Sequence, residues 1–203
     1  MKTSLKIIAM ALLLVGNNAF AQTQLTKDEK SKALDHLQSS QSELLKTVKG
    51  LSEEQLNYKP TPDYWSVAEC VEHLAISETN IFGIVQMTLQ SDPDPSMRGQ
   101  VAMDDDGLLG IITSREQKVK TRPEFEPSGK FGSFKETLDE FKSKRKSNMN
   151  YVKTSTDDLR NRYFDFPFGK VDVYQVILFM SGHAIRHTDQ IKEVMADSGF
   201  PNV

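Results

Sequence analysis

Four long stretches of the chain carry apolar residues at every third or fourth position, and this pattern constrains the fold more than any other feature. Such spacing places the apolar side chains on one face of an α-helix. Each stretch also begins with a residue type that caps helix N-termini. The expected helices cover residues 26–49, 66–91, 133–152 and 172–197, with caps at Thr26, Ser66, Ser133 and Asp172. The sequence therefore predicts an all-α fold, and more narrowly a four-helix bundle.

The connectors between these helices differ greatly in length. Residues 91–132 join the second helix to the third, are rich in Asp, Pro and Gly, and contain one possible short helix near residues 108–119. A connection this long is typical of a crossover in a bundle whose neighbouring helices run parallel. The connector before the fourth helix is aromatic, RYFDFPFGKVD (162–172), and none of the four long stretches has a convincing sheet pattern.

The first 21 residues have the layout of a secretory signal peptide. Two lysines precede a nine-residue apolar run, and Ala19-Phe20-Ala21 forms an A-x-A cleavage site. The run is too short to span a bilayer comfortably. We therefore expect residues 1–21 to be a signal peptide, residues 22–203 to form one domain, and the protein to be exported without remaining in a membrane.

The charge and the cysteine content exclude some classes of protein. The chain has a net charge of −3, which gives no support for nucleic-acid binding. The most basic stretch, residues 142–146, lies among acidic residues and predicts a solvated helix face. Cys70 is the single cysteine, so no internal disulfide can form. Its place four residues after the Ser66 cap, with Trp65 before the cap, predicts a packing role for the thiol.

Two of the four histidines, His183 and His187, lie four positions apart on the apolar stripe of the fourth helix. Residues at this spacing are neighbours on one helix face, so both imidazoles can bind one ion. Two candidates for a third ligand are His36, near the edge of the first helix's stripe, and His73, on a polar face of the second helix. We prefer His73. Zn²⁺ and Ni²⁺ both accept imidazole ligands.

Position 184 separates this pattern from the zinc-protease helix signature. That signature requires a glutamate directly after the first histidine, as general base. Here the residue is Ala184, so the sequence gives no support for peptidase chemistry of that type.

Two motifs resemble the DinB-like family of metal-binding four-helix bundles. Residues 65–74 (WSVAECVEHL) are similar to the family's W-S-x-x-E-x-x-x-H-L segment, and residues 183–191 (HAIRHTDQI) to its H-x-x-R-H-x-x-Q-I segment. The resemblance implies His73, His183 and His187 as metal ligands, the bundle with its long crossover, and often a homodimer. It also implies a hydrolase, or a transferase or isomerase that depends on a small thiol. Phe166 departs from the family, since many relatives carry His there, and export argues against a cytosolic thiol.

Two of the remaining polar residues near the histidines, Glu69 and Arg186, have two interpretations each. Glu69 could act as a catalytic base or second-shell partner, or simply close the capping box with Ser66. Arg186 could bind an anionic substrate or form an ion pair, and Gln190 could orient an imidazole. Three hypotheses follow: an exported metal-dependent enzyme acting on a small substrate, a non-catalytic metal- or ligand-binding protein, and a structural bundle whose histidines are only hydrogen-bonded.

Overall fold

The computed structural model describes residues 24–116 and 120–202. The expected signal peptide lies outside the described residues and stays a prediction. The elements are α1 (Lys27–Thr47), α2 (Glu53–Asn57), α3 (Val67–Thr88), η1 (Pro95–Gln100), α4 (Asp105–Thr113), η2 (Pro123–Phe125), α5 (Phe134–Thr154), β1 (Tyr163–Phe166), β2 (Gly169–Asp172) and α6 (Val173–Met195), where η marks a 3₁₀ helix.

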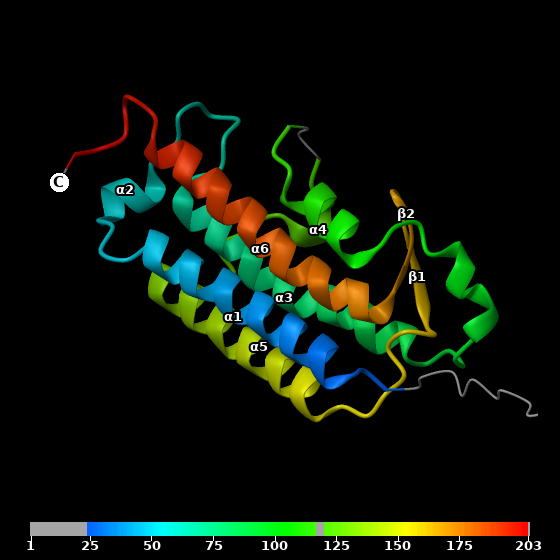
Figure 1. Ribbon diagram of the computed structural model, residues 1–203. Coiled ribbons are helices and arrows are strands. Elements are labelled where there is room, and N and C mark those ends of the chain that lie inside the picture. The colour runs from blue at the N-terminus through cyan, green and yellow to red at the C-terminus, as the bar shows by residue number, and fades with distance from the viewer. Residues whose placement is uncertain (1–23, 117–119, 203) are drawn as a thin grey trace, which may run out of the picture.

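The four long helices α1, α3, α5 and α6 pack into a bundle, which confirms the predicted fold class (Figure 1). Helix α1 lies against α5 and α6, and α3 lies against the same two helices. Figure 1 shows that α3 and α5 run in the same direction, as do α1 and α6. Because α3 and α5 are parallel neighbours, the chain between them must return along the whole bundle, and residues 89–133 make that return.

Local capping explains where each long helix begins. At Thr26, Ser66 and Ser133 the hydroxyl accepts the backbone N–H of a glutamate three residues on, and that glutamate accepts the cap's own N–H. Asp172 and Gln175 form the corresponding pair before α6. All four predicted caps are confirmed, and replacing such a cap by alanine costs about 1 kcal/mol.

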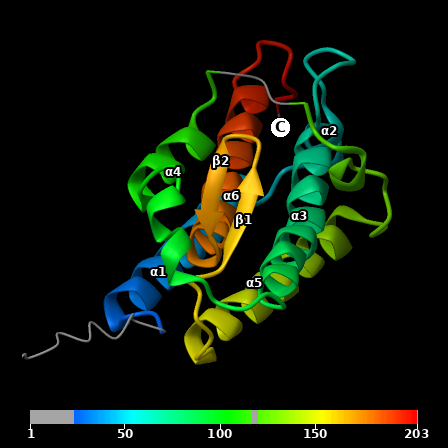
Figure 2. The ribbon, with the colours of Figure 1, turned by 90° about the vertical axis from the view of Figure 1, so that its right-hand side faces the viewer.

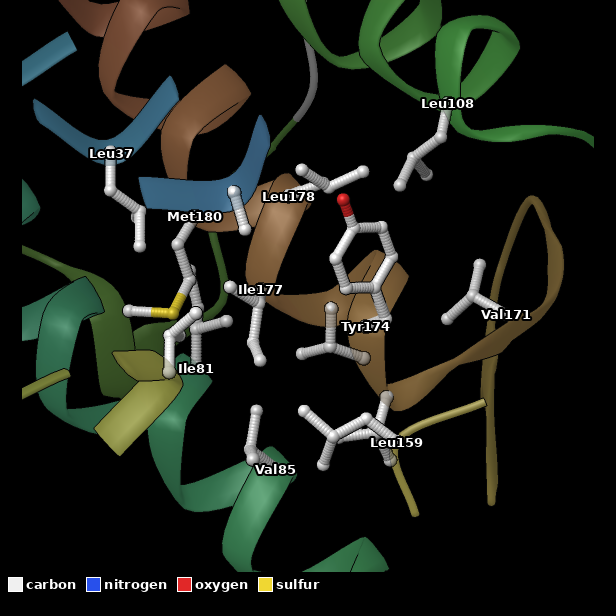
Figure 3. Packing of buried hydrophobic residues seen from close by; sticks show 14 of the residues in the cluster. Leu37, Ile81, Val85, Leu108, Leu159, Val171, Tyr174, Ile177, Leu178 and Met180 are labelled. Carbon is white, nitrogen blue, oxygen red and sulfur yellow. The ribbon is translucent and has the colours of Figure 1, made fainter. Parts of the chain in front are cut away.

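The bundle interior holds two apolar clusters. One surrounds Tyr174, Ile177 and Met180 of α6, where residues from α1, α3 and α4 meet (Figure 3). The other surrounds Cys70, Phe141 and Ile191. Fully burying one such aliphatic or aromatic side chain contributes roughly 1.5–3 kcal/mol, so these clusters fix the relative positions of the helices that carry the histidines.

Residues 163–172, expected only as an aromatic connector, form a β-hairpin. Strands β1 and β2 pair antiparallel with Tyr163 opposite Asp172 and Phe166 opposite Gly169. Gly169 has φ +129°, and a Cβ there would lie 2.5 Å from the Cβ of Ala102 in the crossover. A glycine is needed at this position because the turn and the crossover approach each other so closely.

Arg145 corrects the prediction that residues 142–146 form a solvated face. Its side chain is fully buried and donates to the Glu78 carboxylate (2.6 Å), the Leu37 carbonyl (2.7 Å) and the Ser40 hydroxyl (2.8 Å). The lysines of the stretch, Lys142, Lys144 and Lys146, are at least partly exposed. A buried guanidinium is tolerated here because an equally buried carboxylate neutralises it.

Within the described residues, no helix combines the length and the apolar character needed to cross a bilayer.

Candidate metal centre

Helices α3 and α6 bring three histidines together in the half of the bundle near the N-terminus of α3. His73 is on α3, and His183 and His187 are one turn apart on α6. One ring nitrogen from each lies within 4.8 Å of the other two, so the three could hold one metal ion. His73 and His187 are buried and His183 is partly buried. His36, the other candidate for a third ligand, is half-buried on α1 and is not part of this cluster.

The hydrogen bonds of two rings fix which nitrogen faces the cluster. His73 donates from Nδ1 to the backbone carbonyl of Phe125 (2.7 Å), and His187 donates from Nδ1 to Oε1 of Gln190 (2.9 Å). A neutral imidazole with its proton on Nδ1 has its lone pair on Nε2, where a metal binds. The predicted role of Gln190 in orienting an imidazole is confirmed.

The distance between ligand atoms tests whether the rings suit a metal. Nε2 of His73 and Nε2 of His183 are 3.1 Å apart. Two imidazoles bound to one ion at 2.0–2.1 Å, with an angle between 90° and 110°, have their nitrogens about 2.9–3.4 Å apart. This pair of nitrogens therefore fits a divalent ion held by imidazole, and a ring nitrogen of His187 lies within 4.8 Å of both.

Burial lowers the proton affinity of all three rings. It lowers the pKa of His73 to about 4, partly opposed by the hydrogen bond to Phe125. The pKa values of His183 and His187 lie well below the ordinary value, chiefly because of burial and next because of the neighbouring imidazoles. The rings are therefore neutral at physiological pH, which is the form that binds metal.

Aromatic rings enclose the cluster on two sides. Trp65 packs on His73 and His187, with ring centroids 4.9 and 6.0 Å apart. Phe179, one turn before His183, stacks on that ring at 5.7 Å and 13°. These contacts restrict rotation of the imidazoles and keep water from their faces.

The crossover residues 123–130, here called the strap, are fastened to α3 beside the cluster. The Glu72 carboxylate accepts the backbone N–H groups of Ser128 (3.1 Å), Gly129 (2.9 Å) and Lys130 (3.0 Å). Asn80 donates to the Glu124 carbonyl (2.9 Å). Since the strap also carries the Phe125 carbonyl, Glu72 helps to hold the group that orients the neighbouring His73.

A pocket of about 740 Å³ opens onto the three histidines. Figure 2 shows the elements that carry its lining residues: the hairpin lies between α4 and α3, with α6 behind it. Gly182 permits the close approach of α4, because a Cβ there would already lie 3.1 Å from a methyl group of Ile112. The volume suits a small organic molecule. Its described lining also includes Trp65, Phe125, Arg115, Arg186, Gln190 and four further phenylalanines, Phe164, Phe166, Phe168 and Phe179.

Glu69 makes the contacts of a structural residue. One carboxylate oxygen accepts the Ser66 N–H (2.8 Å) and the other pairs with Lys59 (2.7 Å). Glu69 is absent from the described lining of the pocket. Its catalytic role stays a prediction, and these contacts favour the capping interpretation.

Cys70 is fully buried in an apolar cluster, and burial raises the pKa of its thiol, as expected of a packing residue.

Two groups near the cluster were not predicted from the sequence: the Phe125 carbonyl of the strap, and Glu72, which attaches the strap to α3. The Phe125 carbonyl is a backbone atom, so its residue type carries no signal. Glu72 precedes His73, but its partners lie more than 50 residues away in the chain. His73 lies on a polar face of α3 that also includes Asn80, two turns further on. This face was the available clue, and Asn80 does contact the strap.

Comparison with known proteins shows consistent similarities. The family model described as the DinB superfamily matches residues 36–191. The uncharacterized protein YuaE of Bacillus subtilis is 26% identical over 148 residues, covering 72% of this chain and 87% of YuaE. The structure is similar to that of YfiT from Bacillus subtilis, described as a probable metal-dependent hydrolase with an unusual four-helix bundle topology. The TM-score is 0.61 at 17% identity, covering 87% of this chain and 91% of YfiT.

Proposed function

Because the chain belongs to the DinB superfamily, we propose that it is a metal-dependent hydrolase that acts on a small substrate in the pocket above His73, His183 and His187. The observation that carries the proposal is the cluster itself: three neutral imidazoles whose ligand nitrogens lie within 4.8 Å of one another. The description of YfiT as a metal-dependent hydrolase supports the same reaction class.

The side chains of the site have distinct tasks in this proposal. His73, His183 and His187 would hold a divalent ion, which would supply Lewis-acid chemistry at a substrate carbonyl and lower the pKa of a water molecule. The Phe125 carbonyl and Gln190 hold two imidazoles with Nε2 toward the cluster. Trp65 and Phe179 keep bulk water from the ring faces. Among the described residues of the pocket, Asp63 and Glu126 are the carboxylates available to accept a proton.

A second candidate function is non-catalytic binding of a metal or a small ligand. In the described part of the chain, the cluster contains three histidines and no carboxylate. This composition favours the binding function. Asp63 and Glu126 are both exposed. A hydrolase needs a base within reach of the attacking water. Whether Asp63 or Glu126 acts as that base therefore distinguishes hydrolysis from non-catalytic binding.

Hydrolysis assays test the proposal directly. Untagged protein is stripped with a chelator, loaded with Zn²⁺ or Ni²⁺, and assayed for initial rates on a panel of small esters and amides. We expect turnover by the loaded protein, loss on stripping, and loss in His187→Ala. We also expect Glu126→Gln or Asp63→Asn to lower the rate while leaving metal content unchanged. Equal rates for loaded and stripped protein across the panel would favour the binding function.

A further inference from the structure

Four phenylalanines, Phe164, Phe166, Phe168 and Phe179, form what we call the aromatic wall of the pocket. Phe166 stacks on Phe168 (centroids 5.0 Å apart, 11° between planes) and on Phe179 (4.9 Å, 14°). Phe164 meets Phe166 edge-on at 4.9 Å. Since Phe179 also stacks on His183, the aromatic wall ends at the histidine cluster.

The aromatic wall is incompletely buried. All four of its rings are of intermediate exposure, although each belongs to or packs against the adjoining apolar core. Apolar surface gathered in a pocket favours an apolar ligand, and parallel rings favour a flat one, which can stack on them. The shape and composition of the wall therefore indicate a planar apolar group, placed next to the ligand nitrogens.

The charge of the pocket is opposite to that of the whole protein. Its described lining contains four basic side chains, Arg115, Lys120, Arg122 and Arg186, and only two carboxylates. The complete chain has a net charge of −3. Arg186 directly precedes His187, and Arg115 is held by two hydrogen bonds to Glu193, at 3.0 and 2.6 Å. Positive charge focused in a cleft attracts anions.

We infer that the substrate is an aromatic carboxylate, whose ring lies on the aromatic wall and whose anionic group is bound by Arg186. This inference rests on the proposed function for the reaction itself. A carboxylate suits the pocket better than a phosphate because the excess of basic over acidic lining groups is small and Arg115 already shares its charge with Glu193. A guanidinium binds a carboxylate through two parallel hydrogen bonds.

Ligand binding by metal-free protein tests the inference without any need for turnover. Trp65 is the single tryptophan of the chain and lines the pocket, so its fluorescence reports occupancy. Three probes separate the two features: 3-phenylpropionate, its neutral amide 3-phenylpropanamide, and hexanoate, which keeps the charge but lacks the ring. We expect 3-phenylpropionate to bind at least tenfold more tightly than the amide and severalfold more tightly than hexanoate.

Matched variants assign these preferences to residues. Arg186→Gln should bring the affinities for 3-phenylpropionate and the amide within about twofold of each other, because a neutral side chain no longer favours the charged ligand. Lys192→Gln is the control, because Lys192 is also on α6 but pairs with Glu43 and Asp189 outside the pocket. Phe168→Leu should reduce the preference for the ring over hexanoate while keeping the preference for charge. Circular dichroism spectra establish that each variant is folded.

Three results would overturn the inference: equal binding of the three probes, an unchanged charge preference in Arg186→Gln, or no binding at millimolar concentration. Each would leave the proposed metal-dependent hydrolysis standing, since the metal-free protein is measured. Conversely, a loaded protein that hydrolyses nothing but binds 3-phenylpropionate with these preferences would contradict the proposed function alone.

Discussion

Replacing Glu72 by alanine should weaken the metal centre although the substitution removes none of its three histidines. Glu72 is 7% exposed, and its carboxylate accepts three backbone N–H groups of the strap. The strap in turn places the Phe125 carbonyl 2.7 Å from Nδ1 of His73. Without the carboxylate, the strap loses its three hydrogen bonds at residues 128–130 and keeps the contact of Glu124 with Asn80, so His73 is held less firmly with Nε2 toward the cluster.

The size of the effect follows from the three hydrogen bonds. A hydrogen bond to a charged group contributes about 1.5–3 kcal/mol net. The three donors belong to exposed residues, so water replaces much of what the carboxylate provides. We therefore expect a total loss near the value for a single such bond, about 1.5–3 kcal/mol. If this free energy appears in the ordering of His73, the affinity for the ion falls by roughly ten- to a hundredfold.

Calorimetric titration of untagged, metal-free protein with Zn²⁺ measures this effect. Thr26→Ala is the matched control, because it removes the N-cap of α1 and costs about 1 kcal/mol but has no contact with the strap. We expect its affinity to stay within about twofold of the natural protein. The reasoning is refuted if Glu72→Ala lowers the thermal stability yet binds Zn²⁺ as tightly as the control does.

Three other perturbations test the core and the electrostatics. Glu78→Gln should lower the free energy of unfolding by about 3–5 kcal/mol, because Arg145 is then left buried without a full counter-charge; urea titrations showing a change below about 1 kcal/mol would contradict this. The metal-free protein should lose stability as the pH falls from 6.5 toward 4, since the pKa of His73 is lowered to about 4 and the unfolded chain binds the proton first. The slope for this residue reaches about 1.4 kcal/mol per pH unit and adds to those of His183 and His187, whose pKa values are lowered as well; a slope that is equally steep in His73→Gln, measured by thermal unfolding as a function of pH, would contradict this. Cys70 should react with a thiol reagent only after unfolding, because its thiol is fully buried and burial raises its pKa; rapid labelling of the native protein would exclude the packing role.

Features encoded within a few residues were predictable from the sequence. Each capping box joins residues three positions apart, so Ser66 and Glu69 alone predict where α3 begins. The pair His183 and His187 is visible for the same reason, since both lie on one turn of one helix. The third ligand needed a further argument from helix faces, and the structure brings His73 to the pair.

Features made by long-range contacts were not predictable. Arg145 and Glu78 lie 67 positions apart, and neither alone differs from a surface residue in type. The hairpin was missed because its two-residue loop, Pro167-Phe168, lacks the Asn-Gly or Asp-Gly signal of common hairpin turns. In addition, Phe164 and Phe166 of β1 line a pocket. Aromatic residues can line a pocket from a loop as well as from a strand, so their presence did not indicate a strand.

The metal stoichiometry of the protein tests the role of the three histidines most directly. Untagged metal-free protein is titrated with Co²⁺, whose absorption bands report coordination by imidazole, and the bound ion is then measured by mass spectrometry. We predict one ion per chain in the natural protein, loss of both the bands and the bound ion in His73→Ala, His183→Ala and His187→Ala, and no change in His36→Ala. Binding that survives in all three single variants, or no binding by the natural protein, would contradict this prediction.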